Sequence, residues 1–203
     1  MDPLPREDRM ANKDDIVARM QDLQRQIEQT VAAMPEVAWS KGVYEGGWNA
    51  RELLTHMAST SGTAGFILGM ARMPSAPSLG AGYDENAFNA QQVAAREGKS
   101  ISDTVTEIKG NFQRGMDAVR DAPEDLLTKH WRAPWDVEGE VGDVIVMSLE
   151  GHLGMHLADL RSTAQEKGVV RRRRGVPLRA AVVLNAVIAR ARQLSDCAGE
   201  ETG

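Results

Sequence analysis

Apolar side chains recur at steps of three and four residues along most of this chain, and this spacing limits the possible folds more than any other feature. In the segment from about Asp14 to Met34 the repeated positions are Ile16, Met20, Leu23, Ile27, Val31 and Met34. Such a repeat places one apolar face along a helix. Pro35 then ends the helix. Because the alternation typical of strands is scarce, the sequence predicts an all-α fold.

Proline, glycine and capping residues divide the rest of the chain into further predicted helices. Asn49 is suited to cap the next helix, with Glu52 at the position of its capping-box partner. The predicted helices cover residues 50–73, 84–97, 100–122, 142–167 and 177–196, and a long loop occupies residues 123–142. A chain of 203 residues can fill one domain. We expect a flexible leader at 1–12, a helical bundle at 13–168, and a basic linker with an extra C-terminal helix at 169–203.

Charge, hydropathy and cysteine usage exclude several classes of protein. The net charge of −5 disfavours nucleic acid as the main partner, because phosphate binding needs a positive surface. Every apolar stretch is interrupted before about 18 residues, so we expect no membrane-spanning helix. The first residues lack the apolar segment of a secretory signal. Cys197 is the only cysteine, which is typical of a reducing cytoplasm.

Three of the four histidines occupy unusual positions. His152 and His156 are four residues apart on a predicted helix, so their side chains lie on one face. The same face carries Ile145, Leu149 and Leu160 and should point inward. His56 flanks an apolar stripe on an earlier helix. The histidines are either ligands of one metal ion or ordinary side chains, that is, buried core histidines with polar partners or, for His152 and His156, a partly exposed pair.

A helical bundle would allow the three histidines to meet, because bundles build metal sites from facing helices. Three imidazoles leave coordination positions for water or substrate, as in a catalytic site. Asp159 is placed to accept the second imidazole proton of His156 and so orient it, or else is a solvated surface carboxylate. We expect Glu150 and His130 to face solvent.

Two segments resemble signatures of the DinB-like superfamily of metal-binding helical bundles. GWNARELLTHM resembles its second-helix signature, and EGHLGMHLADL resembles its fourth-helix signature, within a likeness that covers about residues 13–167. The resemblance implies an up-down-down-up four-helix bundle with a long crossover. It assigns a divalent ion, zinc or nickel, to His56, His152 and His156. Relatives include mycothiol-dependent maleylpyruvate isomerase and S-transferases that use mycothiol or bacillithiol. Because the isomerase branch commonly carries glutamate where this chain has His152, we expect a three-histidine member.

Three functional hypotheses follow. The first is a metal-dependent enzyme that joins a low-molecular-weight thiol to a small electrophilic substrate, or isomerises that substrate, because a bound ion stabilises a thiolate. The second is a non-catalytic module that binds a metal or small molecule. The third is an interaction protein acting through Arg171–Arg174 and the C-terminal helix. The competing interpretation of this segment, which we favour, is a solvated charge run followed by a helix packed on the bundle or on a second subunit of a homodimer. Four tryptophans either wall a pocket or cover the bundle ends: Trp39, Trp48, Trp131 and Trp135.

Overall fold

The computed structural model describes residues 12–42, 44, 47–73 and 84–165. Over these residues the chain is mainly helical, with one short two-stranded sheet. The elements in chain order are α1 (Lys13–Ala33), the 3₁₀ turn η2 (Glu36–Ala38), α2 (Ala50–Thr60), α3 (Thr63–Ala71), α4 (Glu85–Ala94), α5 (Ile101–Asp121), α6 (Glu124–Leu127), β1 (His130–Arg132), β2 (Glu138–Glu140) and α7 (Val141–Gln165).

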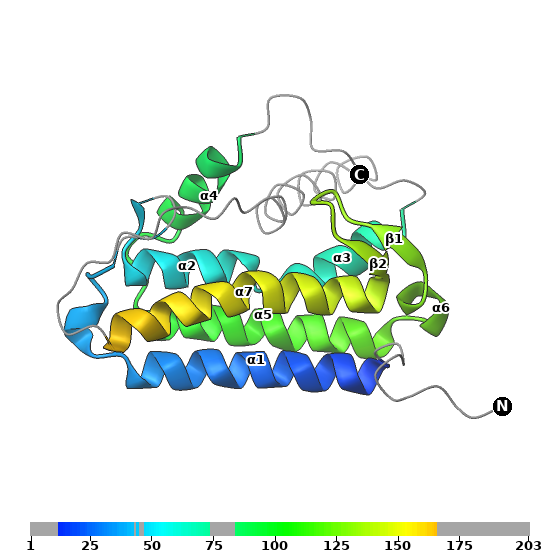
Figure 1. Cartoon of the computed structure of the whole chain (residues 1–203), viewed down its shortest axis with the longest axis horizontal. Coiled ribbons are helices and arrows are strands. Elements are labelled where there is room, and N and C mark those ends of the chain that lie inside the picture. The colour runs from blue at the N-terminus through cyan, green and yellow to red at the C-terminus, as the bar shows by residue number, and fades with distance from the viewer. Residues whose placement is uncertain (1–11, 43, 45–46, 74–83, 166–203) are drawn as a thin grey trace, which may run out of the picture.

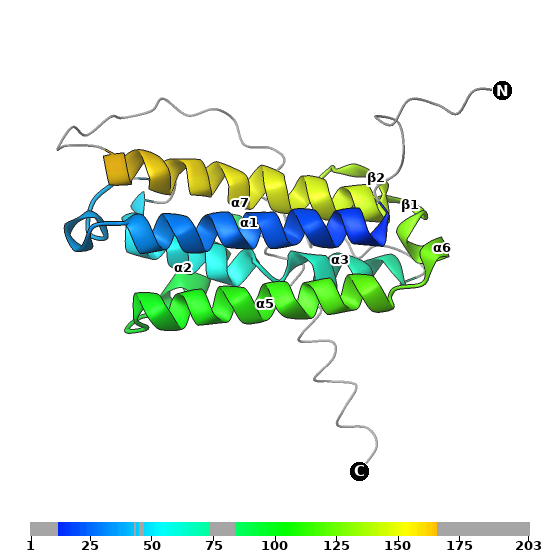
Figure 2. The same ribbon diagram turned by 90° about the horizontal axis from the view of Figure 1, so that it is seen from below.

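Helices α1, α2–α3, α5 and α7 form a four-helix bundle. Helix α1 packs on α5 and α7, and α2 and α3 pack on the same two helices from the other side. The colour gradient in Figure 1 shows α1 and α7 running in one direction and α2–α3 and α5 in the opposite one, and Figure 2 shows α1 beside both α5 and α7. The up-down-down-up arrangement is therefore confirmed. The segment between α3 and α5, which carries α4, is the long crossover.

The apolar repeat of the first helix faces the bundle centre as expected. Ile16, Met20, Leu23 and Ile27 are buried there, and α5 contributes Ile108 and Phe112 to the same core. Asn12 and Ser100 cap the starts of α1 and α5 through their side-chain oxygens. The helix boundaries fall within two or three residues of those expected from the sequence, except in two places.

The first exception is the predicted helix 50–73, which is two helices. The chain turns at Ser61 and Gly62, between α2 and α3. Serine and threonine hydroxyls of this segment bond back to main-chain carbonyls three or four residues earlier, which competes with regular helix and bends it. The side-chain amide of Asn111 on α5 donates to Ala58 O at 3.0 Å and to Ser61 Oγ at 2.8 Å. The break therefore has its own hydrogen-bond partners.

The second exception is the predicted loop 123–142, which contains α6 and an antiparallel hairpin. Strands β1 and β2 pair with His130 opposite Glu140 and Arg132 opposite Glu138. Between them Asp136 has a φ of 63°, a left-handed conformation that aspartate tolerates better than most residues in a turn. The hairpin packs on the start of α7. Strands of three residues are too short to give a readable alternation.

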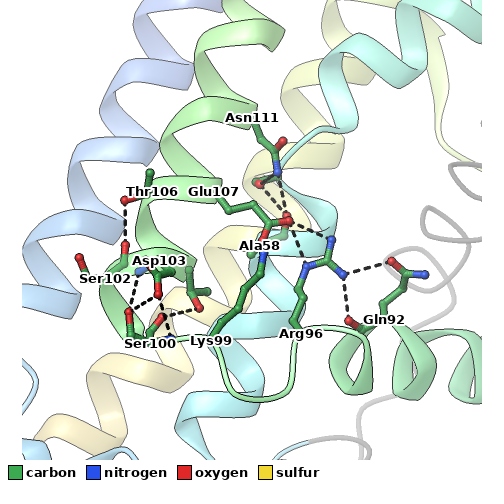
Figure 3. A network of polar contacts seen from close by, with 12 residues as sticks. Ala58, Gln92, Arg96, Lys99, Ser100, Ser102, Asp103, Thr106, Glu107 and Asn111 are labelled. Atoms are coloured by element: carbon green, nitrogen blue, oxygen red, sulfur yellow. Dashed lines mark hydrogen bonds and ion pairs between the residues drawn. The ribbon is translucent and has the colours of Figure 1, made fainter.

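Helix α4 lies over α2 and is tied to α5 by an ion-pair network (Figure 3). Arg96, which follows α4, donates to Glu107 Oε1 through Nε at 3.0 Å and through Nη2 at 2.9 Å. Lys99 donates to the other carboxylate oxygen at 2.8 Å. The Arg96 and Glu107 side chains are only 13% and 20% exposed. This network fixes the end of the crossover against the bundle.

Some expectations concern residues outside the described part of the chain. These are the leader up to residue 11, the arginine run 171–174, the C-terminal helix 177–196 and Cys197. Among the residues that are described, no helix is both long and apolar enough to cross a membrane.

Candidate metal centre

His56 lies on α2, and its position is fixed by the capping residues at the start of that helix. Asn49 and Glu52 form the expected capping box: the Asn49 side chain accepts from the Glu52 N–H at 3.0 Å, and the Glu52 carboxylate accepts from the Asn49 N–H at 2.8 Å. The hydroxyls of Ser59 and Thr60 donate to the His56 carbonyl. The His56 side chain is 2% exposed and faces the bundle interior.

Helix α7 supplies the other two imidazoles. His152 and His156 are four residues apart and 6% and 5% exposed. Leu149, Leu153 and Leu160 of the same helix are also buried. The inward face predicted from this spacing is therefore confirmed.

The three imidazoles meet between α2 and α7. His56 Nε2 lies 3.1 Å from His152 Nε2. The ring centroid of His156 lies 5.1 Å from that of His56 and 4.6 Å from that of His152. One ring nitrogen from each residue falls within a set whose members are all within 4.8 Å of one another. The structure thus brings together the three residues expected to share a site.

Burial determines the charge state of these rings. Burial lowers the pKa of His56 and of His156 well below the ordinary value of about 6.5, and the nearby His152 lowers both further. Arg96 adds a smaller electrostatic effect that also lowers the pKa of His56. Both rings are therefore neutral at pH 7, and each has a nitrogen lone pair available.

The arrangement fits a metal ion better than a set of structural core histidines. Within the described residues, His56 Nδ1 and both ring nitrogens of His156 are buried and make no hydrogen bond. An unsatisfied buried polar group costs about 1–3 kcal/mol, so core histidines normally have partners. An ion shared by the three rings would give a partner to a His156 nitrogen that otherwise has none, and imidazole nitrogen suits zinc, nickel, iron and copper.

The remaining candidate residues lie elsewhere. Asp159 is partly buried on α7, and its main-chain carbonyl accepts from Tyr44 Oη at 3.4 Å and from Thr163 Oγ1 at 3.2 Å. Its role in orienting His156 stays a prediction. His130 is exposed, as expected, and its Nε2 lies 3.4 Å from Glu138 across the hairpin.

Glu150 is not simply solvated. Its carboxylate accepts two hydrogen bonds from Arg19 on α1, at 2.7 and 2.5 Å. The two side chains are about half exposed, and the pair joins α1 to α7 on the side away from the apolar face. Glu150 thus supports the bundle rather than the histidine cluster.

The four tryptophans fall into two groups. Trp39, Trp131 and Trp135 are buried in the apolar core, and the Trp135 indole donates to Ser148 Oγ at 3.2 Å. Trp131 packs edge-on against Trp135, and both cover the end of the bundle near the hairpin. Trp48 differs, because its ring contacts that of His56, with centroids 4.7 Å apart and planes inclined by 34°. Covering the bundle is therefore the correct interpretation for three of them, and Trp48 belongs to the site.

Sequence reasoning missed the electrostatic effect of Arg96 on His56. Its effect on the pKa of His56 depends on the path of the crossover, which carries α4 across α2. No local motif marks that path. In the sequence Arg96 is one charged residue near the end of a predicted helix, and nothing there indicates that it affects His56.

Comparison with protein families gives a match over most of the described bundle. Residues 20–161 match the family described as the mycothiol maleylpyruvate isomerase N-terminal domain. This range includes all three clustered histidines. Among curated proteins, no sequence matches the chain.

Solved structures share the fold at low sequence identity. The protein YfiT from Bacillus subtilis, described as a probable metal-dependent hydrolase with an unusual four-helix bundle topology, superposes with a TM-score of 0.57 at 15% identity, over 81% of this chain and 90% of that one. Mycothiol-dependent maleylpyruvate isomerase superposes with a TM-score of 0.55 at 12% identity over 73% of this chain, and a mutant of that isomerase gives 0.56 at 11% over the same share. The chain spans 60% of the length of both isomerase structures. The expected likeness to DinB-like bundles is confirmed.

Proposed function

Because the chain belongs to the mycothiol maleylpyruvate isomerase N-terminal domain family, we propose that it binds a divalent metal ion and acts as a metal-dependent enzyme on a small electrophilic substrate. The reaction class is thiol S-transfer or thiol-dependent isomerisation. The observation that carries this proposal is the convergence of three buried imidazoles from α2 and α7 on one point.

In this proposal His56, His152 and His156 hold the ion. A bound divalent ion lowers the pKa of a coordinated thiol or water and stabilises the resulting anion. Because all three ligands are neutral imidazoles, they leave the full positive charge of the ion to act on a thiolate. Their burial excludes bulk water from the protein side of the site, which strengthens electrostatic interactions there.

The cosubstrate is a low-molecular-weight thiol such as mycothiol or bacillithiol. In S-transfer the thiolate sulfur forms a bond to the electrophilic carbon. Either the bond from that carbon to a leaving group breaks and the leaving group departs with the electron pair, while the thiol proton passes to solvent or to the leaving group, or a carbon–carbon double bond opens and the proton is taken up by the neighbouring carbon. The two isomerase structures with the same fold are mycothiol-dependent, which supports a thiol as cosubstrate. We propose zinc or nickel as the ion, in the cytoplasm, in a monomer or homodimer.

A thiol-consumption assay tests the enzymatic part of the proposal. The metal-loaded protein is incubated with a panel of small electrophiles and with cysteine, bacillithiol or mycothiol, and free thiol and product are measured. We expect turnover with at least one thiol, and none after chelation of the metal or in the His152→Ala variant. An isomerase would convert its substrate without net loss of thiol, so product analysis accompanies the thiol measurement. If a fully metallated sample gives neither thiol loss nor product, the non-catalytic binding module replaces the enzyme.

A further inference from the structure

We propose that Trp48 is a positioning residue that holds the His56 ring in the orientation needed to bind the ion, and that its indole lies close enough to the ion to report its binding. This inference rests on the proposed metal site. It adds a role for a residue outside the ligand set.

The contact between the two rings is specific. The Trp48 and His56 ring centroids are 4.7 Å apart and the ring planes are inclined by 34°. His152 and His156 meet the same imidazole edge-on, with interplanar angles of 63° and 82° and centroid distances of 5.1 Å. The indole therefore contacts His56 in a tilted arrangement that is closer to parallel than to perpendicular, while the two other histidines approach it edge to face.

His56 needs such support because a common alternative is missing. A metal-binding histidine usually donates its second ring N–H to a carboxylate or carbonyl, which fixes the ring orientation. His56 Nδ1 is buried and has no hydrogen-bond partner among the described residues. The terminal torsion of a histidine side chain has broad energy wells, so packing against a fixed neighbouring ring can restrict it where no hydrogen bond does.

The main chain of Trp48 is itself fixed. Its carbonyl accepts from the Tyr44 N–H at 3.0 Å, and the capping box of Asn49 and Glu52 follows it directly. The indole packs against the apolar core. The cap that starts α2 therefore also determines where the indole lies relative to His56, two helical turns further on.

Cobalt binding provides the test, because Co²⁺ gives visible absorption bands that depend on ligand geometry. Affinity is measured by competition with a chromogenic chelator in the parent, Trp48→Leu and Trp48→Phe. Trp131→Leu is the matched control, because Trp131 contacts Trp135 rather than a histidine. We expect Trp48→Leu to weaken Co²⁺ binding by about ten-fold or more, the usual effect of removing a group that orients a ligand, and to alter the visible bands. Trp48→Phe should restore most of the affinity and the parent spectrum, and Trp131→Leu should leave both unchanged.

Fluorescence gives a second readout that does not depend on the folding of Trp48→Leu. We expect Co²⁺ to quench part of the tryptophan emission of the parent and of Trp131→Leu, and that part to be absent in Trp48→Phe. Unchanged affinity and bands in Trp48→Leu, or an undiminished quenched component in Trp48→Phe, would overturn the inference. A parent that binds no Co²⁺, Zn²⁺ or Ni²⁺ would instead refute the proposed metal site, and this role of Trp48 with it.

Discussion

Nε2 of His56 lies 3.1 Å from Nε2 of His152, although 96 positions separate the two residues in the chain. The contact depends on the bundle topology, which places α2 against α7. In this geometry one ring can donate a hydrogen bond to the other, or both can bind one ion. The unsatisfied nitrogens of His156 beside them favour the ion.

The metal-free protein should lose stability below about pH 6.5, the pKa of an unfolded-state histidine. Burial lowers the pKa of His56 and of His156 in the folded state, so below that pH the unfolded chain binds protons that the folded chain does not. The free energy of unfolding then falls with falling pH, by up to about 1.4 kcal/mol per pH unit for each of these residues. Urea unfolding between pH 7.5 and 5, with protein from which a chelator has removed the metal, measures how the free energy of unfolding changes with pH.

The double variant His56→Gln/His156→Gln is the control for this slope. Carboxylates titrate mostly below pH 5, so their contribution in the measured window is small. We expect the free energy of unfolding of the variant to change clearly less with pH than that of the parent. Equal slopes in the two proteins would mean that these histidines are not held neutral by burial.

Glu107→Gln should destabilise the fold by about 1–2 kcal/mol, because it removes the charge that pairs with the poorly exposed Arg96. Burial alone would raise the pKa of Glu107, but hydrogen bonds from Arg96 and Lys99 lower it overall. The pair therefore stabilises the fold above the ordinary glutamate pKa of about 4.5, and this contribution is lost as the pH falls below it. Urea unfolding monitored by circular dichroism at pH 7 provides the measurement.

Asp117→Asn is the matched control for Glu107→Gln. Asp117 pairs with Arg120 on the same helix, but both side chains are about half exposed. An exposed pair at this spacing contributes less than about 0.5 kcal/mol. Similar losses in the two variants would show that the Arg96–Glu107 pair is no stronger than a surface ion pair.

Asn111→Ala should destabilise the protein by about 1–2 kcal/mol, because the side chain donates to both Ala58 O and Ser61 Oγ at the break between α2 and α3. Gln113→Ala, two residues away on the same helix, removes only an exposed hydrogen bond to Asp117 and should change the free energy of unfolding by no more than about 0.5 kcal/mol. Thermal and urea unfolding of both variants provide the comparison. If Asn111→Ala were as stable as Gln113→Ala, the two hydrogen bonds from Asn111 would not be needed to stabilise the break between α2 and α3.

Most of the architecture could be predicted from the sequence because periodicity and caps act locally. Asn49 with Glu52, for example, marked the start of α2 within the sequence itself. The break at Ser61 and Gly62 was missed, although the Ser-Thr-Ser-Gly-Thr run around it favours such a bend. The hairpin near Trp131 was missed because its strands are three residues long.

The site was predictable only in part, for a physical reason. The spacing of His152 and His156 fixes their common face, since both lie on one helix. The approach of His56, by contrast, depends on packing between helices, and the sequence alone left it open until the family resemblance was considered. The contact of Trp48 with His56 and the electrostatic effect of Arg96 on His56 depend on the path of a loop and of the crossover, which no spacing encodes.

Elemental analysis of the purified protein tests the proposed metal centre most directly. The parent is compared with His56→Ala, His152→Ala and the control His130→Ala, in which an exposed histidine outside the cluster is removed. We predict about one divalent ion per chain in the parent and in His130→Ala, and a large loss in the other two, because each removes one of three ligands. A parent that contains no bound ion after loading with zinc or nickel, or ligand variants that retain the parent's metal content, would contradict the account.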